Sequence, residues 1–284
     1  MEINKNANIL IVGLGLLGGS YAMALKKKGY RVEAITRSQS SIDYALEKGM
    51  IDGGASFPDP EIIGRADIAV FALYPHIFVD WIKENQKYLK SGAVITDVTG
   101  VKSCIVYDIQ EMLRDDVEFI AAHPMAGKEV YGVENSDDKI FEQANYIVTP
   151  TDKNTASAIE LCEELGRVLG FKTVSKLSPE EHDRMIAFLS QLTHCIAVAL
   201  MCSSDNPELV RYTGDSFRDL TRIAKINEEM WSELFLLNKS ALIEEMDEFM
   251  TSFKKLRESL INEDTETMKE MMRLSTERRK LFDK

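Results

Sequence analysis

The chain reads NILIVGLGLLGGS from Asn8 to Ser20, an apolar run that leads directly into a glycine-rich turn. The run has the composition of a buried strand, and residues 21–28 after the turn read as a helix. Gly13, Gly15 and Gly18 have the spacing of the dinucleotide-binding fingerprint. In that fingerprint the first glycine allows a tight turn, the second lets a pyrophosphate approach, and the third lets the helix pack on the strand. The stretch therefore predicts a nucleotide-binding turn, the alternative being an ordinary glycine-rich connection.

The nucleotide's phosphates are expected at the amino end of this helix, where free backbone N–H groups and the helix dipole favour anions. The residues expected to hold the cofactor there are Gly13, Leu14, Gly15, Leu16, Leu17 and Gly18. A second strand-like run, residues 30–35, ends at Thr36 and Arg37. NAD-specific folds place an acidic side chain near this point, whereas an arginine accommodates a 2′-phosphate. Arg37 could equally stack on adenine and tolerate either cofactor, so NAD and NADP both stay open.

Composition limits the class of protein. The chain has 284 residues, 45% of them hydrophobic, which suits one large or two modest domains. A net charge of −12 argues against a basic nucleic-acid-binding surface. The four cysteines have no metal-ligand or C-x-x-C spacing, so we expect free thiols in a reducing cytoplasm and no metal site. No signal peptide is expected at the amino end, and the most apolar helix, residues 185–201, is too polar and too short for a confident membrane span.

Strand-like and helix-like runs alternate through the first part of the chain. This alternation predicts a doubly wound, mostly parallel, Rossmann-like sheet with helices on both faces. The carboxyl ends of its strands face the cofactor in such folds, which places Leu73 and Asp97 beside it.

A further strand over residues 117–122 runs into His123, with Lys128 and Glu129 close behind. An imidazole at the carboxyl end of a strand is suited to proton transfer near neutral pH. We therefore predict His123 as the catalytic base and Lys128 and Glu129 as substrate contacts. The alternative is a loop histidine with internal hydrogen bonds.

The pattern changes at Ser178, which reads as a helix N-cap followed by proline and completed by Glu181 as a capping box. No clear strand is visible beyond this point. We predict a dinucleotide-binding domain over residues 1–177 and an all-α domain over residues 178–284. Residues 185–201 are apolar almost all round and should form its central buried helix.

Polar side chains interrupt that helix at Ser190, Gln191 and His194, spaced to share a face. Burying them costs free energy unless they are partnered or line a cavity. We predict that they contact the substrate, with internally bonded core residues as the alternative.

Positive charge recurs further on at Arg218, Arg222 and Lys225, spaced by four and three residues. A guanidinium binds a carboxylate with two parallel hydrogen bonds, so this face is a candidate carboxylate site. Salt bridges to Asp215 or Asp219 are the alternative. Residues 231–260 and 265–281 then read as long amphipathic helices, suited to a bundle or a dimer interface.

Taken together, these segments resemble the prephenate and arogenate dehydrogenases of tyrosine biosynthesis over nearly the whole chain. The resemblance rests on the segments GLGLLGGS at residues 13–20, DVTGVK at 97–102, HPMAG at 123–127, SQLTH at 190–194 and FRDLTRIA at 217–224. It implies oxidative decarboxylation of prephenate to 4-hydroxyphenylpyruvate, hydride transfer to NAD or NADP, and a homodimer formed through the carboxyl-terminal helices.

The resemblance also implies roles for individual residues. The family histidine matching His123 bonds the ring hydroxyl and assists its deprotonation, the arginine matching Arg222 binds the ring carboxylate, and the histidine matching His194 lies in the substrate pocket. The family often has serine where Gly100 stands, so Thr99 is the candidate substitute, and it often has histidine where Gln191 stands.

Three alternatives remain. Arogenate carries an ammonium where prephenate has a keto group; Gln191 favours prephenate, whereas the carboxylate of Glu129 favours arogenate. A β-hydroxyacid dehydrogenase would use a lysine on the central helix, and residues 185–201 contain none. A nucleotide-sensing protein without activity would lack His123, His194 and Arg222, and all three are present.

Overall fold

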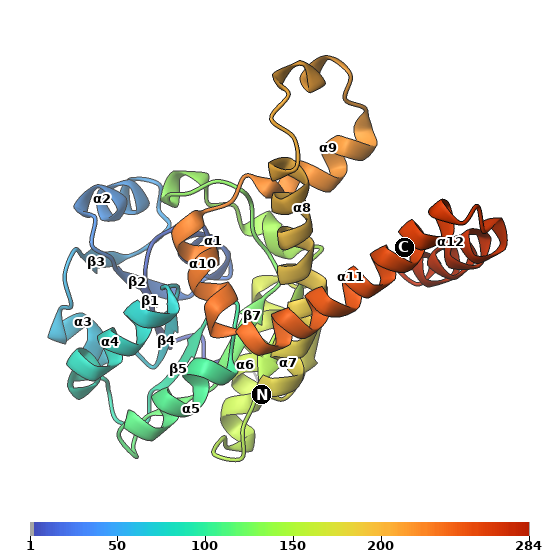
Figure 1. Ribbon diagram of the computed structural model, residues 1–284. Helices are drawn as coiled ribbons and strands as arrows, with labels where there is room; N and C mark the ends of the chain where they lie inside the picture. Colours follow the sequence, from blue (N-terminus) through green and yellow to red (C-terminus); the bar gives the residue numbers. More distant parts are fainter. Residues whose placement is uncertain (1–2, 284) are drawn as a thin grey trace.

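The computed structural model describes residues 3–283. Its first half is built on a six-stranded sheet, all parallel, in the order β3-β2-β1-β4-β5-β6 (Figure 1). The strands are β1 (Asn8–Val12), β2 (Arg31–Ile35), β3 (Gly53–Ala55), β4 (Ile68–Phe71), β5 (Val94–Asp97) and β6 (Glu118–Phe119). The helices between them are α1 (Leu16–Lys27), α2 (Gln39–Glu47), α3 (Pro60–Arg65), α4 (Pro75–Asn85) and α5 (Ser103–Met112). Apolar side chains of the strands are buried on both faces, and the predicted Rossmann-like sheet is confirmed.

A second, three-stranded sheet follows. Strand β7 (Ala121–Pro124) pairs antiparallel with β8 (Asn145–Thr149), which pairs parallel with β9 (Thr173–Lys176). Helix α6 (Ala156–Leu169) connects the last two strands. The single strand predicted over residues 117–122 is therefore wrong. It divides at Ile120 into β6 and β7, which pair with different sheets, and His123 lies within β7 rather than after it.

From Pro179 onward the described chain contains helices only. They are α7 (Pro179–Ile186), the π-helical segment η4 (Ala187–Leu192), α8 (Thr193–Cys202), the short η5 (Pro207–Arg211), α9 (Asp215–Thr221) and η6 (Arg222–Ala224), α10 (Glu228–Leu237), α11 (Lys239–Ile261) and α12 (Thr265–Lys280). The expected capping box of Ser178 and Glu181 forms at the start of α7. Figure 1 shows α10 beside the sheet, whereas α11 and α12 extend away from it.

The long helix predicted over residues 231–260 breaks at Asn238. This residue is buried, and its Nδ2 atom donates 2.8 Å hydrogen bonds to the Asp183 carbonyl and to Gln191 Oε1. Because these bonds fix the side chain between elements, the chain turns here and α10 and α11 take different directions.

The prediction that residues 185–201 form a buried helix is wrong for the single chain. Phe188, Leu189 and Met201 are 54%, 45% and 46% exposed in the single chain. Among the described residues one helix, Pro179–Cys202, has the length and mean hydropathy (1.9) of a membrane span, with 28% of that window buried. Membrane spans and helices covered by other protein segments share this length and composition.

Candidate active site

The glycine turn between β1 and α1 has the geometry that its sequence predicts. Gly13 has a φ of 101°, and a Cβ atom there would lie 2.4 Å from the Ala72 carbonyl oxygen. A Cβ atom on Gly18 would lie 1.9 Å from the Gly13 oxygen, whereas one on Gly15 would meet nothing within 4 Å. The first and third glycines are thus required by packing, and the second borders open space.

A dinucleotide fits this open side of the turn. Helix α1 starts directly after Gly15 with no side-chain cap and no acidic residue in its first turn, so its amino end can accept an anion. The Leu73 side chain lies against the turn, 3.0 Å from where a Gly13 Cβ would be. Leu14 is buried, and Leu16 and Leu17 are half-buried, so their backbone rather than their side chains is suited to contact a cofactor.

The end of β2 carries no free carboxylate. Thr36 is half-buried and Arg37 is exposed. The nearby Glu33 is buried and accepts two hydrogen bonds from Arg65, at 2.6 and 2.7 Å. Among residues 3–283 the Arg37 guanidinium has no hydrogen-bond or ion-pair partner, so it is available to a ligand.

Asp97, at the end of β5, lies in a buried polar cluster rather than on an open surface. Its Oδ2 atom is 2.6 Å from Lys102 Nζ, and both side chains are fully buried. Lys102 Nζ also donates to the Ala122 carbonyl and to Thr99 Oγ1, at 2.5 and 3.1 Å. Burial lowers the pKa of Lys102, and the Asp97 carboxylate opposes that shift.

Thr99 belongs to this cluster. It is 4% exposed, its hydroxyl bonds Asp97 and the Val101 carbonyl, and its N–H donates to Asp97 at 3.0 Å. These contacts engage the Thr99 hydroxyl and the Asp97 carboxylate within the chain. The role of Thr99 toward the substrate hydroxyl and the contact of Asp97 with the cofactor stay predictions.

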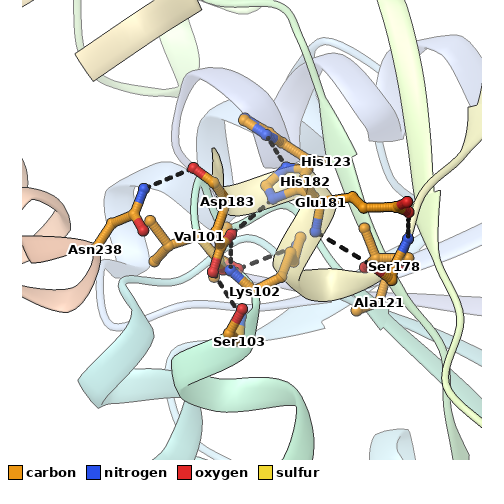
Figure 2. Close-up of polar contacts among 12 residues, drawn as sticks. Val101, Lys102, Ser103, Ala121, His123, Ser178, Glu181, His182, Asp183 and Asn238 are labelled. Carbon is orange, nitrogen blue, oxygen red and sulfur yellow. Dashed lines mark hydrogen bonds and ion pairs between the residues drawn. The ribbon is translucent and has the colours of Figure 1, made fainter. Parts of the chain in front are cut away.

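His123 continues the cluster toward the second half of the chain (Figure 2). Its Nδ1 atom lies 2.9 Å from Nε2 of His182, and Nδ1 of His182 lies 2.8 Å from Asp183 Oδ1. The Asp183 carboxylate also accepts 2.8 Å hydrogen bonds from the backbone N–H groups of Lys102 and Ser103. Desolvation, with repulsion from His182 and Lys102, holds the pKa of His123 well below its usual value.

The sequence reasoning missed His182, Asp183 and Lys102. The charged run at residues 180–184 resembles a solvated first helical turn, and only its position after a capping box marked it. Desolvation lowers the pKa of His182. For Asp183, burial favours the neutral acid, but hydrogen bonds from His182 and Ser103 outweigh it and hold the pKa below its usual value.

A second group gathers around His194. Its ring stacks on Trp231 of α10, with centroids 3.7 Å apart, and its Nδ1 atom bonds the Ser190 carbonyl at 2.8 Å. Desolvation lowers the pKa of His194, with smaller effects of opposite sign from Glu129 and Arg222. Arg222 Nη1 lies 2.5 Å from Glu129 Oε1, so a guanidinium of the second half meets the loop that follows β7.

The remaining predicted contacts lie elsewhere. Gln191 is 1% exposed; its Nε2 atom donates to the Leu234 carbonyl at 3.0 Å, and its Oε1 atom accepts from Asn238. These bonds agree with the alternative of an internally bonded core residue, and the substrate contact of Gln191 stays a prediction. Lys128 pairs with Asp137 at the surface, and Arg218 pairs with Asp215.

Helix α10 joins the two groups. Trp231 stacks on His194, and one turn later Leu234 lies beside Gly100: a Cβ on Gly100 would be 3.5 Å from Leu234 Cδ1 and 3.9 Å from His123 Nε2. Glu233 of the same helix accepts a 2.9 Å hydrogen bond from the His76 N–H at the start of α4. His123, His194 and the carboxyl edge of the parallel sheet are thus brought together by one helix.

Comparison with known proteins identifies the family of the chain. The family model described as "Prephenate dehydrogenase, nucleotide-binding domain" matches residues 21–174, and "Prephenate dehydrogenase, dimerization domain" matches residues 178–274. The chain belongs to the prephenate dehydrogenase family. The match to the nucleotide-binding domain begins at residue 21, after the glycine turn. The assignment of that turn to cofactor binding therefore depends on its geometry.

Individual relatives agree with the family models. The chain is 31% identical to the prephenate dehydrogenase of Bacillus subtilis, over 92% of this chain and 72% of that protein. It is 26% identical to the cyclohexadienyl dehydrogenase of Zymomonas mobilis, over 96% of this chain and 94% of that protein. The structure of prephenate dehydrogenase from A. aeolicus in complex with hydroxyphenyl propionate and NAD+ superimposes with a TM-score of 0.89 at 30% identity, covering 99% of this chain and 100% of that one.

Proposed function

We propose that the chain is a prephenate dehydrogenase, converting prephenate to 4-hydroxyphenylpyruvate and carbon dioxide with reduction of a nicotinamide cofactor. The observation that carries the proposal is that His123 and Leu234 of α10 both lie beside Gly100, while Trp231 of the same helix packs against His194. This arrangement supports a neutral base and a binding site for a ring substrate at the edge of a nucleotide-binding sheet. The family membership supplies the substrate class.

His123 accepts the proton of the ring hydroxyl in this proposal. Its lowered pKa keeps the imidazole neutral near pH 7, as a base requires. The bound nicotinamide supplies the hydride acceptor for the carbinol carbon. As the O–H and C–H bonds break and the carbonyl forms, the bond to the ring carboxylate breaks and carbon dioxide leaves. The electron pair of that bond makes the ring aromatic and converts the carbonyl oxygen to a phenolate, which takes back a proton to give the hydroxyl of the product.

Arg222 is proposed to bind the ring carboxylate. In this structure it is paired with Glu129, and its side chain is 67% exposed. A substrate carboxylate therefore competes with Glu129 for the guanidinium. This competition limits how tightly the leaving carboxylate is held, which suits a group that departs in the reaction, because tight ground-state binding would not accelerate it.

We also propose that NADP is accepted as cofactor. The end of β2 offers an unpaired Arg37 and the half-buried Thr36, while the nearest buried carboxylate, Glu33, is held by Arg65. An arginine without an acidic neighbour suits a 2′-phosphate, and the acidic side chain that accepts hydrogen bonds from the ribose hydroxyls of NAD is missing at this point of the described chain. Arg37→Ala is expected to raise KM for NADP about tenfold, the value of roughly one charge-assisted contact, and to leave KM for NAD nearly unchanged.

Arogenate remains the second candidate substrate. The preference for prephenate drew on Gln191, which is occupied by Asn238 and the Leu234 carbonyl, whereas Glu129 lies near His194 and could meet an ammonium group. Relatives include a cyclohexadienyl dehydrogenase. The family comparison still favours prephenate.

The helical half is proposed to form a homodimer, with the predicted division at residues 177 and 178 as its boundary. Support comes from the family model of a dimerization domain and from the exposed apolar side chains of the central helix, Phe188, Leu189 and Met201. A partner subunit would cover these side chains without a membrane. The four free cysteines fit the cytoplasmic location that we propose.

One assay tests the function. Purified protein is mixed with prephenate or arogenate and with NAD or NADP, and the absorbance of the reduced nicotinamide is followed. Turnover of prephenate above that of arogenate is expected. Absence of turnover with all four pairs would overturn the proposal, and preference for arogenate would replace the substrate.

A further inference from the structure

We propose that His182 and Asp183 are positioning residues that hold His123 in the tautomer whose Nε2 atom is unprotonated and faces the substrate. The inference deepens the proposed function and rests on it. Both act through the His123 ring: Figure 2 shows His182 bonded to His123 on one side and to Asp183 on the other.

The first step is the state of Asp183. Its two oxygens lie at the start of α5, where they accept backbone hydrogen bonds from Lys102 and Ser103, each 2.8 Å long. Such donors stabilise an ionised carboxylate, and an ionised carboxylate can only accept hydrogen bonds. The His182 nitrogen 2.8 Å away, Nδ1, must therefore carry the proton that joins the two groups.

The second step passes this constraint to His123. Desolvation keeps His182 neutral, so a proton on its Nδ1 leaves its Nε2 as an acceptor. The partner of that acceptor is His123 Nδ1, 2.9 Å away, which must donate. Since His123 is neutral as well, its Nε2 has a free lone pair.

The third step is direction. His123 Nε2 lies 3.9 Å from the position of a Cβ on Gly100, and the two Leu234 methyl carbons lie 3.5 and 3.7 Å from the same position. We infer that the lone pair is directed to the space that Gly100 of the β5–α5 loop shares with Leu234 of α10. A substrate hydroxyl there would transfer its proton to His123 Nε2. The hydrogen bond from His123 Nδ1–H to His182 stays in place, and through His182 it links the new imidazolium to the Asp183 carboxylate.

The charged groups around His123 fit this scheme. Helix α7 contributes His182 and Asp183, and the end of β5 with its loop contributes Asp97 and Lys102. Lys102 repels the protonated ring, so the resting base stays neutral. Asp183 is the nearest anion reached through hydrogen bonds when the ring takes up its proton.

The test compares four variants at saturating prephenate and cofactor. His182→Leu and Asp183→Asn are expected to lower kcat about 100-fold with little change in either KM, because an unfixed base samples the wrong tautomer. His182→Gln can both donate to Asp183 and accept from His123, and should keep kcat within about tenfold of wild type. Glu181→Gln, the matched carboxylate-to-amide change two residues from Asp183, preserves the capping box and should stay within about twofold.

Coupling separates positioning from general structure. In a His123→Asn background, His182→Leu is expected to lower kcat no further, because the two residues act as one unit. Nitrogen-15 NMR of the histidine rings in the unmodified protein should show a protonated Nδ1 and a bare Nε2 on His123. Melting temperatures identify any variant that fails to fold.

The outcomes are distinct from those of the functional assay. If wild type turns over none of the substrates, the proposed function fails, and the NMR measurement still decides the tautomer. Two results with an active wild type would overturn the positioning role. One is a kcat of His182→Leu equal to that of Glu181→Gln. The other is a fall in kcat by the same factor when His182→Leu is made in the His123→Asn background. A protonated Nε2 on His123 would overturn it as well.

Discussion

Lys102→Met tests the buried ion pair on which the site is built. The Lys102 and Asp97 side chains are both fully buried, 2.6 Å apart, and methionine keeps the length of the side chain while removing its charge. Removing one partner of a buried pair costs about 3 to 5 kcal/mol, because a carboxylate is left without its cation. Asp97 keeps other donors, among them the Thr99 and Ala122 N–H groups at 3.0 and 3.1 Å, so we expect the lower end, about 3 kcal/mol.

For a chain of this size, 1 kcal/mol corresponds to about 2–4 °C in Tm, so Lys102→Met should melt about 6–12 °C below wild type. Thermal unfolding followed by circular dichroism measures the shift. The double variant Asp97→Asn/Lys102→Met should melt above the single one, because no buried charge is left unpaired. Lys83→Met is the control. Lys83 pairs with Asp80 at the surface, at 3.2 Å, and the loss of this ion pair should not change Tm measurably. Equal melting temperatures for Lys102→Met and Lys83→Met would refute the reasoning.

The other predictions concern the reacting groups. His123→Asn should lower kcat about 10²- to 10⁴-fold, the usual contribution of a positioned base, and near-normal turnover would discard that role. Arg222→Gln should raise KM for prephenate more than KM for the cofactor; equal changes would argue against carboxylate binding. Gly100→Ser should fold normally, because a Cβ there meets no atom closer than 3.5 Å, and a changed KM for prephenate would place the new hydroxyl in the pocket. The pKa values of His123, His182 and His194 are all lowered, so the unfolded chain binds more protons below about pH 6.5, and stability should fall as pH drops from there toward their lowered pKa values. Denaturant midpoints that stay constant between pH 7 and pH 5 would contradict this.

Local signals predicted the nucleotide half well. The strand before Gly13 and the turn after it are encoded within a dozen residues, and both form as expected. The pairing of β7 with β8 could not be read in the same way, because it joins residues more than twenty positions apart, His123 and Ile147 among them. Nothing in the local sequence marks the point at which the chain leaves one sheet for the other.

The helical half was harder to predict for a different reason. Gln191 and His194 share a face only if the helix keeps 3.6 residues per turn. Residues Ala187–Leu192 form a π-helical segment, whose wider turn shifts that register. Gln191 therefore faces Asn238, whereas His194 faces Trp231. His182 was missed because its charged neighbours suggest a solvent-exposed helical turn, although the His182 side chain is fully buried.

Each of the two groups proposed to act on the substrate is held by a partner from the other part of the chain. His123 comes from the sheet and is fixed by His182 of α7, whereas Arg222 comes from the helices and is paired with Glu129 of the loop after β7. Helix α10 is joined to the start of α4 by the hydrogen bond from the His76 N–H to Glu233. In the proposed mechanism, a base and a guanidinium held in this way reach their working positions only when the two parts of the chain are in contact. We therefore expect substitutions at this contact to lower activity as well as stability.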